Sequence, residues 1–135
     1  MASVLKVDEM QGVTTADQVT VTVGSATQYV QAGLNKMWIA FNGNTATAHD
    51  SLNVASETDN GTGDYTFNFT NNFNAAKTYT SAQSVQLSSS SYPGSYIANT
   101  SLALTSSIRV YPTRSTGGAM LDTEYNTLNC SGDLA

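Results

Sequence analysis

The clearest alternation of apolar and polar positions lies in residues 52–70, LNVASETDNGTGDYTFNFT. Every second residue of 65–69 is aromatic, which is the period-two pattern of a half-buried β-strand. Leu52 and Val54 alternate with polar or small residues on a first arm. Between the arms, residues 59–64 combine two glycines with Asp and Asn, a composition typical of a tight turn. The stretch therefore predicts an antiparallel hairpin whose aromatic face needs a cover.

Shorter segments with similar patterns predict further strands, and turn signals separate them. The strongest of these signals is the Asn42-Gly43 pair. Residues 25–34 fit either a loose helical turn or an extended crossing, and we expect a connector there. Residues 120–135 fit either a short helix or a strand. The predicted strands outside the hairpin are 18–24, 36–41, 78–87, 96–98, 102–104 and 108–111.

The order of these elements indicates the fold class. Roughly seven short strands without alternating helices predict an all-β protein built mostly from antiparallel hairpins. We expect an antiparallel β-sandwich, jelly-roll-like, formed by residues 35–135. Residues 13–34 would provide a strand and a connector, and residues 1–12 an extended amino-terminal anchor segment.

The anchor assignment rests on Val4, Leu5 and Val7, which lie among polar residues in a short extended segment. This segment belongs to no recognisable hairpin. A lone strand cannot satisfy its own backbone, so we expect it to pair with a neighbouring subunit or with a docking surface. The alternative is a frayed terminus.

Composition favours contact between chains. The chain of 135 residues is near the lower limit for burying a good core alone, so help from an oligomer is expected, in particular a homotrimer. Only 11% of the residues are charged, against about 25% in typical domains. Ser, Thr and Asn take up the difference, and they suit sheet faces that pack closely against neighbouring chains.

Charge and hydropathy exclude several classes of protein. The net charge is -5 and the five Lys and Arg residues are scattered, which argues against nucleic acid as a partner. No apolar run approaches the roughly 18 residues needed to cross a bilayer, so no membrane insertion is expected. The first residues lack the pattern of a signal peptide. A single cysteine excludes an internal disulfide framework.

No constellation for catalysis is evident, and we expect no enzyme activity and no cofactor. His49 is the one histidine, and Cys130 lies far from it in the sequence; a structural role is favoured for both. Asp59, Asn60 and Asp64 could offer oxygens to calcium, but they miss the EF-hand spacing, and ordinary turn chemistry is favoured over a metal site.

Aromatic residues suggest where partners bind. Trp38 lies in the most apolar strand, so we expect it in the core or in a subunit interface rather than in a ligand site. Tyr92, Tyr96 and Tyr111 flank loops rich in Ser and Gly, a composition found where aromatic faces meet sugars or protein partners. These tyrosines are candidate contacts to a receptor or a glycan; the alternative is that they cap the edge of the sandwich.

Residues 38–43, 50–56 and 58–70 resemble a segment of bacteriophage tail-fibre and related virion proteins, especially those of aquatic phages, and residues 3–8 resemble their amino-terminal start. The resemblance implies a non-enzymatic structural protein of the virion, usually a trimer, assembled in the host cytoplasm and joined to other tail or capsid proteins by its amino terminus. The chain is short for such a fibre, so a short fibre, a tail adaptor or a capsid decoration remains open. The alternative is a free, lectin-like carbohydrate-binding β-sandwich.

Overall fold

The computed structural model describes residues 19–23, 25–30, 34–86, 102–112 and 120–135. The chain divides into two compact units, Met1–Leu34 and Asn35–Ala135. In the first unit, strand β1 (Thr20–Val23) pairs antiparallel with β2 (Ala26–Tyr29). The prediction of a strand at β1 is confirmed. The prediction of a connector was wrong for β2, because pairing with β1 gives its backbone groups their hydrogen-bond partners.

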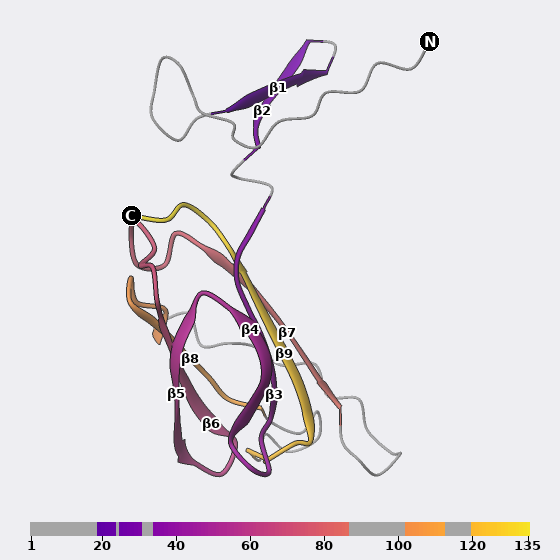
Figure 1. Ribbon diagram of the computed structural model, residues 1–135, viewed down its shortest axis with the longest axis vertical. Helices are drawn as coiled ribbons and strands as arrows, with labels where there is room; N and C mark the ends of the chain where they lie inside the picture. Colours follow the sequence, from indigo (N-terminus) through magenta and orange to yellow (C-terminus); the bar gives the residue numbers. More distant parts are fainter. Residues whose placement is uncertain (1–18, 24, 31–33, 87–101, 113–119) are drawn as a thin grey trace. The chain divides into compact units, whose positions relative to one another are not determined.

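The second unit consists of two antiparallel sheets (Figure 1). The described residues contain no α-helix, so the prediction of an all-β, antiparallel protein is confirmed. The four-stranded sheet has the order β4 (Thr47–Leu52), β3 (Asn35–Asn42), β9 (Tyr125–Ser131) and β7 (Thr80–Gln86). The three-stranded sheet has the order β5 (Val54–Gly61), β6 (Asp64–Phe69) and β8 (Ser107–Val110).

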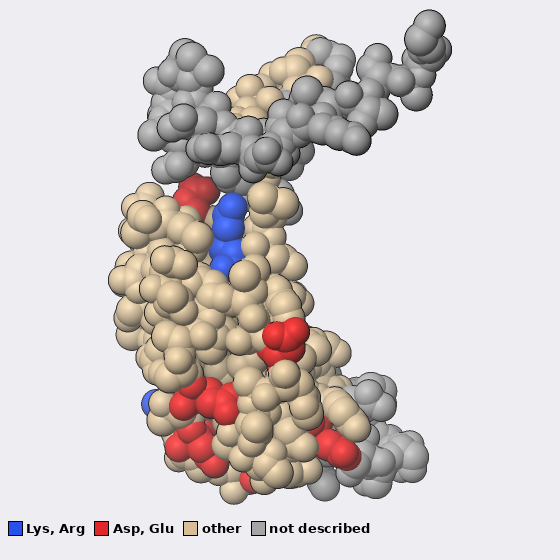
Figure 2. Space-filling model, in the orientation of Figure 1, with Lys and Arg blue, Asp and Glu red and all other residues tan. Residues whose placement is uncertain are grey.

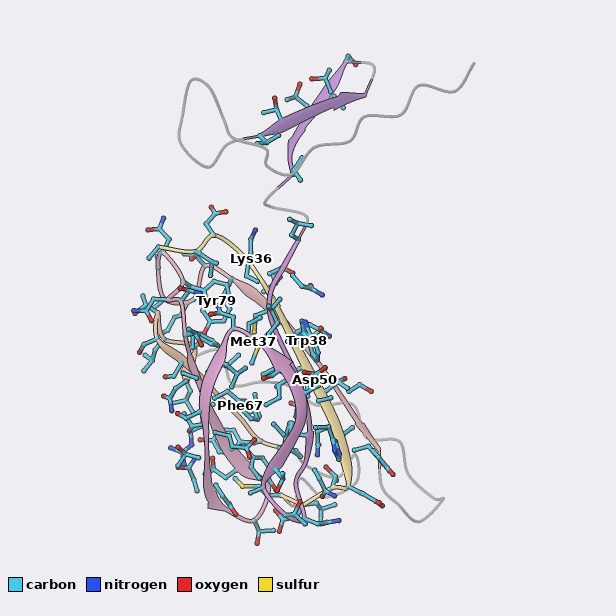
Figure 3. The ribbon with its side chains drawn as sticks, viewed as in Figure 1. Lys36, Met37, Trp38, Asp50, Phe67 and Tyr79 are labelled. Carbon is cyan, nitrogen blue, oxygen red and sulfur yellow. The ribbon has the colours of Figure 1, made fainter. Side chains whose placement is uncertain are left out.

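The core forms where the apolar sides of β3 and β6 meet. Met37 and Ile39 alternate with more exposed residues along β3 and are almost fully buried. The ring of Phe41 lies 5.1 Å from that of Tyr65 and 4.9 Å from that of Phe67, both edge-on. Figure 3 shows Met37 and Phe67 in the space between the two sheets. The four-stranded sheet therefore covers the aromatic face predicted from the sequence.

A single residue, Asn53, separates β4 from β5, and there the chain passes from one sheet to the other. Its φ of 60° lies in the left-handed region, which Asn tolerates better than most residues. Its side chain accepts a hydrogen bond from the N–H of Asn71 at 2.6 Å and donates one to the Asn71 carbonyl at 3.0 Å. The predicted hairpin is confirmed for β5 and β6. Leu52, however, belongs to β4 in the other sheet, because the chain turns at Asn53.

The loop after β6 contributes to the core, although its sequence is mostly polar. Phe73 is 1% exposed and stacks on Tyr79 with 4.1 Å between ring centroids. Its ring also meets that of Phe69 edge-on at 5.0 Å. One apolar residue in a polar loop produces no periodicity, so the sequence pattern did not indicate this burial.

Sheet pairing decides the structure of two further segments, residues 120–135 and 102–104. The carboxyl-terminal tail forms β9, an inner strand whose Leu128 and Cys130 are fully buried. The strand expected at 102–104 was wrong, since Ala103 forms only an isolated bridge to Ile108 while Leu104 is 50% exposed. The strand expected at 96–98 lies outside the described residues.

Candidate functional site

Of the residues predicted to bind partners, Tyr111 is the one that falls among the described residues. Tyr92 and Tyr96, and the anchoring residues Val4, Leu5 and Val7, lie outside them. Tyr111 directly follows β8 and is partly buried. The guanidinium carbon of Arg109 lies 5.4 Å from the centroid of its ring, within the range of a cation–π contact.

Arg109 is itself held by Asp64 on the neighbouring strand β6. Its Nε donates to Asp64 Oδ1 at 2.7 Å, and its Nη2 donates to the second carboxylate oxygen, so the pair is bidentate. The side chain of Asp64 is only 13% exposed. Bidentate pairing fixes the plane of the guanidinium, which a single contact would leave free to turn.

Asn60, near the end of β5, extends the same group of side chains. Its Nδ2 donates to Thr66 Oγ1 at 2.9 Å and to Asp64 Oδ1 at 3.2 Å. Thr66 pairs with Arg109 in the sheet register, so both side chains lie on one face. That face is the outer one, since Tyr65 and Phe67 occupy the inner face. We call the group of Asn60, Asp64, Thr66, Arg109 and Tyr111 the Tyr111 surface.

The charges of the Tyr111 surface compensate each other. Hydrogen bonding from Arg109, with a further contribution from its charge, lowers the pKa of the Asp64 carboxyl, and Asp64 in turn raises the pKa of Arg109. Figure 2 shows a largely uncharged face on this unit, with acidic side chains gathered toward the end that carries the β3–β4 and β5–β6 turns. The Tyr111 surface thus offers a neutral ion pair beside an aromatic ring.

The Tyr111 surface has hydrogen-bond donors that are not used within the described part of the chain, and their arrangement favours one class of ligand. A guanidinium has five N–H donors, and only two N–H···O bonds are made to Asp64. The remaining donors, the Thr66 hydroxyl and the ring of Tyr111 suit a ligand that has both hydroxyl groups and an apolar face. A saccharide has this combination.

Acidification should reveal the contribution of Asp64 to stability. The folded-state pKa of Asp64 is lower than 3.8, the value of the free group, so the ion pair stabilises the fold above that pH and the stabilisation is lost as pH falls through the lowered pKa. Asp64→Asn should therefore be less stable than the parent chain near about pH 7, with the gap closing toward about pH 2. Urea unfolding at both values measures it. A gap that is unchanged by acid would contradict the role of the charged pair.

The residues considered for catalysis have separate surroundings. His49 is exposed, and its ring lies 6.3 Å from that of Tyr125. Cys130 is fully buried, and burial raises the pKa of its thiol to about 12. A thiol with so high a pKa is a poor nucleophile at neutral pH. His49 and Cys130 therefore do not form a nucleophile–base pair in the structure.

The carboxylates of the turn considered for calcium, Asp59 and Asp64, accept hydrogen bonds from within the chain. Asp59 Oδ1 accepts the N–H of Gly61 at 2.8 Å, while Asp64 is engaged by Arg109. Among the residues that the structure describes, no group of three or more His, Cys, Asp or Glu side chains could hold a metal ion. In the same part of the chain, no helix has the length and apolarity to cross a membrane.

Trp38 lies on the outer side of the four-stranded sheet. It is partly exposed and pairs in register with Leu52, which is 48% exposed. Figure 3 shows Trp38 and Asp50 on the side of β3 away from Met37. Of the two positions expected for Trp38, the core is therefore wrong, because strand alternation gives the inner face to Met37 and Ile39; the interface stays a prediction.

The sequence did not indicate the pairing that organises the Tyr111 surface. Asp64 and Arg109 are 45 residues apart and are brought together by the pairing of β6 with β8.

No family model, curated protein or solved structure matches the chain. Functional conclusions therefore rest on the sequence pattern and on the geometry of the site.

Proposed function

We propose that this chain is a non-enzymatic structural protein of a bacteriophage virion, a short fibre or a surface decoration of the tail or capsid. Its two packed sheets would form a β-sandwich head, and Val4, Leu5 and Val7 would dock it on other virion proteins. The proposal rests on the position, in the fold, of the segments that resemble phage tail-fibre proteins. Residues 38–43, 50–56 and 58–70 lie almost entirely in β3–β6, and two of these strands, β3 and β6, supply a large part of the buried core.

Particle incorporation tests the docking role. The chain lacking residues 1–12 should be absent from purified particles, while particles made with the full chain contain it, as measured by mass spectrometry. Circular dichroism of the shortened chain checks that the head remains folded. Incorporation of the shortened chain at the normal level would contradict the docking role.

The head would also bind a glycan through the Tyr111 surface. In a virion this binding would serve attachment to the host surface; in the alternative reading the chain is a free, lectin-like carbohydrate-binding module. Support comes from the fixed Arg109–Asp64 pair next to the Tyr111 ring, since pre-organised polar groups beside an aromatic face bind saccharides at a low entropic cost.

Two tyrosine variants test the glycan site. Tyr111→Ala should weaken binding by about tenfold, because aromatic contacts contribute on the order of 1 kcal/mol beyond the area they bury. Tyr125→Ala is the matched control, since Tyr125 is 51% exposed and belongs to the four-stranded sheet. A glycan array followed by titration calorimetry gives the affinities. Equal losses in the two variants, or no glycan bound by the parent chain, would contradict this site.

A further inference from the structure

Four strands of the second unit are the outermost strands of the described sheets. They are β4 and β7 in one sheet and β5 and β8 in the other. The free side of an edge strand presents unpaired backbone groups and invites pairing with another chain, unless the protein blocks it with bulges, charges or short strand length. The four edges differ in this protection.

The edge strand β4 is blocked by carboxylates and by a bulge. The N–H of Ala48 donates to Glu57 Oε1 at 3.2 Å, and the N–H of Ser51 donates to Asp50 Oδ1 at 2.8 Å. The register of β4 against β3 also shifts between Ala40 and Phe41. Two backbone donors of β4 are thus already satisfied.

The edges of the three-stranded sheet are protected as well. On β5 the N–H of Gly61 donates to Asp59 Oδ1 at 2.8 Å, and the register shifts at two places. Strand β8 has only four residues, and its outer side already carries the bridge from Ile108 to Ala103. Neither edge offers a long, regular row of free backbone groups.

Strand β7 differs from the other three. It pairs with β9 over seven consecutive positions without a register shift. Its sequence, TSAQSVQ, has no charge, no Pro and no Gly. Ala82 and Ser84 are small and exposed on the outer face. No side chain in the described part of the chain accepts a hydrogen bond from the β7 backbone in the way Glu57 and Asp50 do on β4.

Gln83, the middle residue of β7, lies on the same side of the strand as Val85, which is 7% exposed. Both polar atoms of its side-chain amide, Nε2 and Oε1, are buried and have no hydrogen-bond partner. A buried amide left without partners is unfavourable, and such groups are rare in folded proteins. The amide therefore lies inside the chain and not at the free edge of the strand.

We propose that β7 pairs antiparallel with β7 of a second copy of this chain, about a two-fold axis at Gln83. In this register Ala82 faces the partner's Ser84, and the two Gln83 side chains face each other. The pairing joins the four-stranded sheets of two copies into one continuous sheet. The assembly stops at two copies, because the dimer uses the β7 edge of each chain. It is independent of the role in a virion.

Among the described strands, β7 of a second copy is the best partner for this edge. The partner needs an uncharged strand of similar length whose backbone groups are free, and among the described strands β7 alone has these properties. Small outer side chains avoid steric conflict across the new pair. The absence of charge on β7 removes the repulsion that would separate identical edges.

Charge substitutions on β7 test the register. The full chain should have a mass near twice 14.2 kDa by light scattering at micromolar concentration. The double variant Ala82→Lys/Ser84→Lys brings like charges together at both facing positions, and so does Ala82→Glu/Ser84→Glu. Each should raise the dissociation constant by at least about tenfold. An equimolar mixture of the two variants should recover the doubled mass, which also shows that both are folded.

A control double variant, Ser56→Lys/Thr58→Lys, adds the same charge on the protected strand β5 and should leave the mass unchanged. Three results would overturn the proposal. They are a parent mass near 14.2 kDa, a mass near three times that value as in the homotrimer expected from the sequence, or a mixture of the two charged variants that stays monomeric.

Discussion

Replacing Gly63 by alanine is expected to destabilise the head by about 3–5 kcal/mol, as backbone strain and overpacking add. Gly63 has a φ of 63°, in the left-handed region. A Cβ there would overlap the backbone nitrogen of Leu121 and lie 2.8 Å from Cβ of Met120 and 2.9 Å from the carbonyl oxygen of Pro112. Backbone atoms cannot move aside as a flexible side chain can, so the turn itself would have to shift.

The neighbouring glycine provides a matched control. Gly61 has a φ of 125°, but a Cβ added there meets nothing within 4 Å. Gly61→Ala should therefore cost only the backbone strain, about 1–3 kcal/mol. Urea unfolding followed by circular dichroism measures both variants. Equal losses at the two positions would mean that strain, and not the contact with residues 120–121, decides the stability of this turn.

Gly63 matters because it lies in a network that joins separate turns. Its N–H donates to Asp122 Oδ1 at 2.7 Å, and the same oxygen accepts the Tyr65 hydroxyl at 2.6 Å. The Tyr65 oxygen also lies 2.9 Å from the carbonyl oxygen of Gly43, whose N–H donates to the backbone of Thr123. A displaced Gly63 should thus loosen the β3–β4 turn and the segment before β9 as well.

Phe41→Ala is the second change with a large expected effect, about 3–5 kcal/mol for a buried Phe. Phe41 is 1% exposed, and its ring meets Tyr65 and Phe67 of the opposite sheet. Removing it leaves a cavity at the contact between the two sheets, which are rigid enough that collapse is incomplete. The free energy of unfolding in urea should fall accordingly.

Trp38→Ala is the informative comparison, since Trp38 lies on the same strand and faces the other way. Its larger ring is partly exposed and lies outside the buried cluster. The monomeric head should lose less than about 1.5 kcal/mol, well under the cost of emptying a core site. Far-UV circular dichroism is the suitable signal, because the variant lacks the one tryptophan. A loss as large as that of Phe41→Ala would show that the outer face is covered.

Several strand positions and the aromatic face of β6 could be predicted from the sequence. Alternation is a local property, and burying one side of an extended segment requires it, so Tyr65, Phe67 and Phe69 identify their own inner face. The Asn-Gly pair at the end of β3 and the glycine-rich turn before β6 could be predicted for the same reason, since turns need residues with particular backbone freedom. These features depend only on neighbours in the chain.

Other features depended on residues far apart in the sequence. The corner at Asn53, the burial of Phe73 and the pairing of Asp64 with Arg109 leave no periodic trace, because each involves one residue and a distant partner. The sequence did not show which face of β3 carries Trp38, because both faces of this strand have apolar residues and the pattern does not indicate which one is buried.

The sequence by itself thus determined the all-β class and which side of β6 would be buried, through rules that act within a few residues. Only the tertiary structure decided which strands became neighbours, and with them the Tyr111 surface and the difference between β7 and the protected edges. Sheet pairing is non-local: it joins segments according to the whole arrangement of backbone partners, and the chemistry of both surfaces follows from that arrangement.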